Sequence, residues 1–177
     1  ADERRTTYVR NAANQVTRQK TEAKQGASWV TANDRSFAYD GAGRQTAACE
    51  HDVLVAGASA YTCGSLANAP TGVRQSRTAY CESGDIGAGI CPIVGLVKSI
   101  DGPRTDVSDL TTFTYRQADD LTGCDTGGAC HYKGDLWKVT DALGRVTETI
   151  RYDRMGRVTR TKDANGVFTD FEYHAKG

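Results

Sequence analysis

The sequence predicts an all-β protein, a ribbon of antiparallel β-hairpins, and three observations support this. First, a unit recurs near the end of the chain: Gly134, Asp141 and Gly144 return as Gly156, Asp163 and Gly166, each 22 residues later. Second, each unit holds two short segments rich in Val, Thr, Tyr, Phe and Ile, the residues that favour strands. Third, no segment has helical periodicity; the best candidate, residues 11–25, has too few apolar residues to form a face.

The composition supports a thin sheet and excludes two classes of partner. Only 38% of the 177 residues are apolar, and 19 are glycine, which is too little for a thick core. Lys plus Arg and Asp plus Glu both total 22, so the chain lacks the basic excess expected of a nucleic-acid-binding protein. No run of about 20 apolar residues is present to span a membrane.

Turns divide the predicted strands. Asp141 and Asp163 each open a turn, and the glycine three places later supplies the positive φ that leads into the next strand. A second phrase, Tyr-Asp followed by Gly-Arg, occurs at 39–44 and again at 152–157. The residues that define the repeat are therefore Tyr39, Asp40, Gly43, Tyr115, Asp141, Gly144, Tyr152, Asp153, Gly156, Asp163, Gly166 and Tyr173.

The repeat divides the chain into two regions. Residues 1–32 are predicted to be a degenerate or edge repeat, and residues 33–177 to be regular repeats. Three insertions interrupt the second region, at about 49–66, 81–94 and 116–133. We expect the last two to leave the ribbon at the same edge, between a tyrosine and the following glycine.

Each insertion contains two of the six cysteines. This placement favours local disulfides joining Cys49 to Cys63, Cys81 to Cys91, and Cys124 to Cys130. Each bridge would stabilise a loop that has little core of its own by roughly 2–3 kcal/mol. Free buried thiols and metal ligation are the alternatives, although the first two spacings do not fit a zinc site. Disulfides would place the protein outside the reducing cytosol.

Single residues offer little support for catalysis. His51, His131 and His174 have no nucleophile motif beside them, and we expect them on the surface or in loops. Asp52 and the pair Asp119–Asp120 are expected to be turn carboxylates rather than catalytic acids. The glycines at 84–89 lack the Lys-Ser/Thr of a phosphate-binding loop and are expected to form a flexible stretch. We therefore predict no catalytic residue, no metal site and no cofactor.

Two further expectations concern the surface. The repeat tyrosines could serve sugars as a stacking platform, but their position makes packing between successive units the preferred interpretation. In residues 145–152 one face carries Val146, Glu148, Ile150 and Tyr152, so neither face is cleanly apolar. We therefore expect a wall that is wet on both sides.

The residues resemble a known family. The stretches "FAYDGAGR", "GLVKSIDGPRTDVSDLTTFTY" and "GDLWKVTDALGRVTETIRYDRMGR" are similar to the YD repeats of bacterial RHS proteins, which are related to Tc toxin C components and teneurins. The resemblance implies a β-sheet ribbon that spirals into a hollow shell, which in toxin-bearing members encloses a C-terminal effector. The core-terminating Asp-Pro-x-Gly-Leu motif of that family is not found in these 177 residues.

The expected function is thus that of a non-catalytic wall segment of a secreted or cell-surface bacterial protein. Its partners would be the rest of the shell and an effector domain within the same polypeptide. The alternative is an adhesin-like module that binds glycans or a cell-surface protein.

Overall fold

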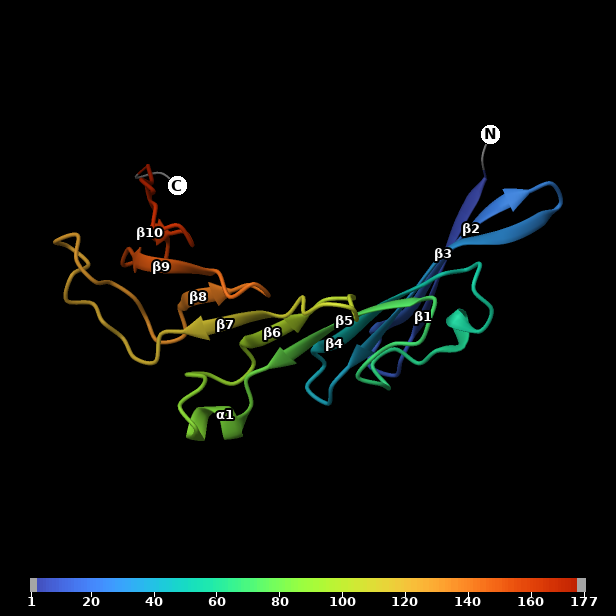
Figure 1. Cartoon of the computed structure of the whole chain (residues 1–177), viewed down its shortest axis with the longest axis horizontal. Helices are drawn as coiled ribbons and strands as arrows, with labels where there is room; N and C mark the ends of the chain where they lie inside the picture. Colours follow the sequence, from blue (N-terminus) through green and yellow to red (C-terminus); the bar gives the residue numbers. More distant parts are fainter. Residues whose placement is uncertain (1–2, 175–177) are drawn as a thin grey trace. The chain divides into compact units, whose positions relative to one another are not determined.

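A computed structural model describes residues 3–174, and within them the all-β prediction is confirmed. The strand order in the sheet follows the chain from β1 to β11, and the registered neighbours are antiparallel (Figure 1). The chain forms two compact units: Ala1–Thr78 with Asp101–Ser108, and Ala79–Ile100 with Asp109–Gly177. The elements are β1 Arg4–Arg10, β2 Val16–Gln25, β3 Ser28–Tyr39, β4 Gln45–His51, β5 Val73–Tyr80, β6 Val97–Asp101, β7 Thr111–Tyr115, β8 Leu136–Thr140, β9 Val146–Tyr152, β10 Val158–Lys162, β11 Phe168–Asp170, the short helix α1 Ser83–Gly87 and the 3₁₀ turn η1 Ala58–Ala60.

In the first unit, one face of the sheet is covered. The connection between β4 and β5 carries η1, and its Cys63 packs against Ala47 and Cys49 of β4. Tyr61 and Val73 extend this small core. Wetting on both sides therefore does not hold here, because the insertion has enough apolar side chains to bury one face. The repeat pattern alone contains no strand register from which to assign that face.

In the second unit, the core lies beneath the insertion at about 81–94. Cys81, Cys91 and Tyr115 are buried, and side chains of α1, β7 and β8 pack around them. Residues 83–87 form the single turn of α1, so the expected flexible stretch is wrong. The local cause is a capping box, in which Glu82 and Asp85 each accept a hydrogen bond from the other's backbone N–H.

Strict alternation also fails between β9 and β10. The register shifts between Val158 and Thr161, and Thr149 and Tyr152, three residues apart, are both buried. Tyr152 and Val146, which alternation places on one face, differ in exposure at 7% and 37%. A β-bulge explains this, since an extra residue re-aims the side chains that follow it.

The segment with the best helical pattern is extended. Residues 11–14 form a turn and 16–25 form β2, which agrees with its lack of an apolar face. Among the described residues, no helix has the length and apolar character needed to cross a membrane.

Candidate functional site

The repeat turns share one hydrogen-bond pattern, seen clearly at Asp141. Its Oδ1 accepts hydrogen bonds from the backbone N–H groups of Leu143 and Arg145, both at 2.9 Å. Its carbonyl accepts from the N–H of Gly144, whose φ of +76° the turn requires. Its own N–H donates to the Arg145 carbonyl at 3.0 Å, which closes the hairpin.

An arginine four residues later completes the turn. Arg145 Nε donates to Asp141 Oδ2 at 2.7 Å. The same contact joins Arg44 to Asp40 and Arg157 to Asp153, also at 2.7 Å. The backbone N–H of Arg145 holds the pKa of the Asp141 carboxyl below its usual range, and the Arg145 guanidinium acts in the same direction.

The turns at the two edges of the ribbon are therefore the same structure. In the second unit, Asp141 and Asp163 open turns at one end of the strands and Asp153 opens one at the other. At Asp163 the fourth following residue is Val167, so the backbone bonds remain without an arginine at this position. The sequence phrases differ mainly in the tyrosine that precedes the aspartate.

A further copy of the turn begins at Asn11, which the Asp-x-x-Gly pattern does not match. Asn11 Oδ1 accepts from the backbone N–H groups of Ala13 and Gln15, both at 3.0 Å. Asn11 Nδ2 donates to Gln15 Oε1 at 2.8 Å, in place of the arginine contact. Asn14, with φ of +63°, replaces the glycine. After glycine, Asn is one of the residues that best tolerate a positive φ, so Asn14 was the sequence signal from which this turn could have been predicted.

Four repeat tyrosines each donate a hydrogen bond from the hydroxyl to a backbone carbonyl at the start of an earlier strand. Tyr152, at the end of β9, donates from its hydroxyl to the Leu136 carbonyl at the start of β8, at 2.6 Å. Tyr115 donates to Val97 at 2.6 Å in the equivalent way. Corresponding bonds run from Tyr39 to Val16 at 2.9 Å and from Tyr173 to Val158 at 2.7 Å. Each of these hydroxyls bonds to a backbone carbonyl of the same sheet, which agrees with the packing interpretation.

Burial distinguishes the tyrosines from one another. Tyr115 and Tyr152 are buried, and desolvation raises the pKa of both phenols. Tyr173 is 43% exposed and lies under the Arg157 guanidinium, 4.5 Å from its ring centre.

The three disulfides join the local pairs that the sequence favours: Cys49–Cys63, Cys81–Cys91 and Cys124–Cys130. Cys49 lies within β4 itself, so that bridge ties the insertion to the sheet rather than closing a free loop.

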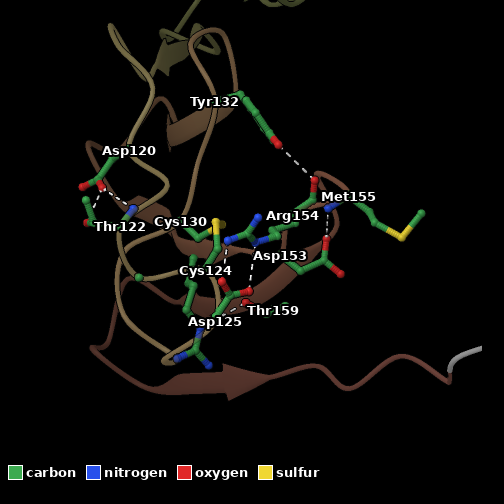
Figure 2. The surroundings of a disulfide bond; sticks show 12 residues. Asp120, Thr122, Cys124, Asp125, Cys130, Tyr132, Asp153, Arg154, Met155 and Thr159 are labelled. Carbon is green, nitrogen blue, oxygen red and sulfur yellow. Dashed lines mark hydrogen bonds and ion pairs between the residues drawn. A yellow bond between two sulfur atoms is a disulfide. The ribbon is translucent and has the colours of Figure 1, made fainter.

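Further contacts hold the Cys124–Cys130 loop (Figure 2). Arg154 Nε donates to Asp125 Oδ1 at 2.9 Å, and the Tyr132 hydroxyl donates to the Arg154 carbonyl at 3.1 Å. Arg151 donates to the Gly127 carbonyl. The loop is therefore fastened to the β9–β10 hairpin at several points as well as by its disulfide.

Polar groups under the first insertion are buried and paired. Asp34 is 1% exposed and accepts two bonds from Arg18 and one from Ser59, at 2.5–2.8 Å. Burial opposes the charge of Asp34, but the bonds from Arg18 and Ser59 outweigh it and lower its pKa. Gln75 accepts from the Tyr61 hydroxyl at 3.0 Å and donates to the Leu66 carbonyl at 3.1 Å.

His51 belongs to this buried network, so its expected surface position is wrong. It is 5% exposed; Nε2 lies 2.7 Å from the Ser36 hydroxyl and Nδ1 lies 2.8 Å from the Ala58 carbonyl. The register places His51 opposite Asp34 on the face that the insertion covers. Its contacts join strand to insertion, a structural arrangement that the isolated His-Asp dipeptide could not reveal.

The other predicted candidates lie in or near connections. Asp52 and Asp120 accept from the backbone N–H two residues ahead, as turn carboxylates do, and Asp119 accepts from the N–H of Lys133. His131 forms an isolated bridge with Asp120, and His174 is exposed. Within residues 3–174 no three His, Cys, Asp or Glu side chains are grouped to hold a metal ion.

Comparison with known proteins identifies the repeat. Residues 132–169 match the family model described as RHS Repeat. These residues span β8, β9, β10 and most of β11, with their Asp turns and Tyr152. No curated protein matches the chain. The match covers less than half of the chain and identifies this segment as an RHS repeat, whose Tyr and Asp contacts recur in the rest of the sheet.

Proposed function

We propose that this RHS-type repeat module is a non-catalytic segment of a β-sheet wall, in a shell that encloses a C-terminal toxin or effector. The observation that carries the proposal is the recurring hydroxyl-to-carbonyl bond of Tyr39, Tyr115, Tyr152 and Tyr173. Each bond spans one hairpin, so units can be added along the chain without changing the pattern.

The sheet supports a role as part of a larger wall. The registered pairs join strands that are consecutive in the chain, and such a ribbon gains stability by extension, since a lone hairpin is marginal in water. Every residue of β1 and β11 is exposed. Unpaired backbone N–H and C=O groups along an edge strand can form hydrogen bonds with another strand. In our proposal, further strands of the same shell form these bonds.

The disulfides support a location outside the reducing cytosol. RHS repeats occur in secreted and cell-surface proteins, and three disulfides are compatible with that setting. We propose a secreted or surface-bound bacterial protein whose partners are the remaining shell and the effector it carries.

Catalysis is not part of this role. The histidine with close partners under the insertion, His51, bonds to a hydroxyl and a backbone carbonyl. The turn carboxylates are occupied by backbone N–H groups and arginines. No cofactor is included in the proposal.

The alternative role is an adhesin-like module that binds glycans or a surface protein. The repeat tyrosines do not favour it, because their hydroxyls already bond to backbone carbonyls and two of the rings are buried.

The test is limited proteolysis and electron microscopy of the natural gene product that contains this chain. We expect a hollow shell with these repeats in its wall, and an effector region that resists protease until the shell is opened. An effector region cleaved at the same rate as the isolated effector, or particles without a lumen, would reject the encapsulation role.

A further inference from the structure

The three disulfides differ in how deeply their cysteines are buried. Four of the cysteines belong to the two small cores and are at most 7% exposed: Cys49, Cys63, Cys81 and Cys91. The Cys124–Cys130 bridge belongs to neither core. Cys130 is 0% exposed, but Cys124 is partly exposed and begins a loop in which residues 125–129 are all exposed. Cys124 is therefore the cysteine that a reagent in solution reaches most easily.

The same bridge closes the shortest loop. Its cysteines are 6 residues apart, against 10 and 14 residues for the other two bridges. A bridge stabilises the folded chain less when the loop that it closes is short. By linkage, the folded chain then protects that bridge less against reduction, because the same coupling free energy acts in both directions. Exposure and loop length thus indicate the same bridge as the most easily reduced one.

We propose that the Cys124–Cys130 bridge is a thiol-exchange site, which a small thiol such as glutathione opens while the other two bridges stay closed. The thiolate of one glutathione attacks Cys124 Sγ, forms a mixed disulfide there and displaces Cys130 as a thiolate, which takes a proton from water. A second glutathione thiolate attacks the glutathione sulfur of the mixed disulfide. It releases oxidised glutathione and leaves Cys124 as a thiolate, so two electrons pass from two glutathiones to the bridge.

Access and anchoring favour attack at Cys124 rather than at Cys130. Exchange requires a thiolate to approach one sulfur atom of the bridge. Cys130 is buried, and its carbonyl accepts a hydrogen bond from the backbone N–H of Tyr152 at 2.9 Å. The next residue, His131, is held by backbone bonds to Asp120. Cys130 is therefore fixed to the sheet, whereas Cys124 lies at the start of the exposed loop.

The other contacts of the loop are weak ones (Figure 2). Arg154 is paired with Asp125, but the two side chains are 62% and 68% exposed, and exposed ion pairs contribute little to stability. Arg151 donates to the Gly127 carbonyl, but it also donates to the Thr159 hydroxyl at 3.1 Å and keeps that partner if the loop moves. Reduction of the bridge therefore frees residues 124–130.

The sheet beside the loop has contacts that do not depend on the bridge. The Tyr152 hydroxyl donates to the Leu136 carbonyl at 2.6 Å, and β9 pairs with β8 from Lys138–Glu148 to Thr140–Val146. None of these contacts includes residues 124–130. Reduction therefore changes one loop and leaves the ribbon in place when the chain passes from an oxidising to a reducing compartment. This inference goes beyond the wall function and does not depend on it.

The test is reduction of the full chain by glutathione, with samples quenched by iodoacetamide over time and each cysteine followed by peptide mass spectrometry. We expect Cys124 and Cys130 to become alkylated at least about tenfold faster than the other four cysteines, because their bridge is reached without opening a core. The mixed disulfide with glutathione should be found on Cys124. Changes in ¹H–¹⁵N spectra should be confined to residues 117–135 and to the β9–β10 hairpin.

Unfolding in urea is the first control, and a variant is the second. In urea the three bridges should react at similar rates, because burial no longer distinguishes them. Cys124→Ala combined with Cys130→Ala should give the spectrum of the reduced chain without glutathione, and its other four cysteines should react as slowly as in the parent chain.

Four results would overturn the proposal. They are reduction of another bridge at the same rate, a glutathione adduct on Cys130 instead of Cys124, a tenfold difference that persists in urea, and loss of the strand signal in far-UV circular dichroism when the Cys124–Cys130 bridge alone is reduced. The parent chain gives all four readouts, so the test does not depend on the folding of the double variant.

Discussion

Replacing Tyr152 with Phe tests the tyrosine bond that recurs along the ribbon. The substitution removes one oxygen atom, which donates to the Leu136 carbonyl at 2.6 Å. Tyr152 is only 7% exposed and Leu136 is partly buried, so water has limited access to the carbonyl left behind. The ring, which provides the apolar packing, is retained.

The expected loss follows from these contacts. A net hydrogen bond contributes about 1 kcal/mol, and a buried acceptor left without a donor adds to the loss, so Tyr152→Phe should destabilise the chain by about 1–2 kcal/mol. For a chain of this size each kcal/mol lowers the melting temperature by about 2–4 °C.

Tyr173→Phe provides the control within the same chain. Its hydroxyl makes the same type of bond, to the Val158 carbonyl at 2.7 Å, but the side chain is 43% exposed. Water can replace the lost donor there, so the free energy of unfolding should change by less than about 0.5 kcal/mol.

Urea unfolding followed by far-UV circular dichroism measures both variants. We expect a lower urea midpoint for Tyr152→Phe with an unchanged slope, and a midpoint close to that of the parent chain for Tyr173→Phe. Equal midpoints for the two variants would refute the claim that the buried bond stabilises the repeat.

The disulfides, a close backbone approach and the turn carboxylates give three further predictions. Replacing both Cys49 and Cys63 with Ala should cost about 3 kcal/mol in urea unfolding, against about 2 for Cys124 and Cys130, because the first bridge closes the longer loop. Gly123→Ala should prevent the Cys124–Cys130 disulfide from forming, because the added Cβ would lie 2.4 Å from the Ala129 nitrogen, and mass spectrometry without reductant would show the lost bridge. Gly87→Ala is the control, because its Cβ meets nothing within 4 Å and the substitution should be tolerated. The folded pKa values of the Asp40 and Asp141 carboxyls are lowered, so both should titrate below the unfolded value of about 3.9 in ¹³C NMR. The stability that they contribute is therefore present above that pH and is lost as the pH falls through the folded pKa. Titration at or above about 3.9 would contradict the turn structure.

Local chemistry made much of the ribbon predictable. The turn at Asp141 depends on residues within five positions of one another, so the sequence contains the whole motif. The disulfide pairing could be predicted for the same reason, because the two cysteines of each pair are close in the chain.

Long-range register was not predictable in this way. The burial of His51 depends on which face the β4–β5 connection covers, and that requires the pairing of His51 with Asp34 across two strands. The bulge that buries both Thr149 and Tyr152 likewise depends on how β9 meets β10. The turn at Asn11 was missed because amides replace the carboxylate and the guanidinium while keeping the same geometry.

The most direct test of a ribbon built by repetition is the strand order in solution, measured by nuclear Overhauser effects between backbone protons of facing residues. We predict these effects between consecutive strands, such as Lys138 with Glu148 and Thr112 with Thr140. Nuclear Overhauser effects between strands that are distant in the chain, as in a closed barrel or a sandwich, would contradict the ribbon.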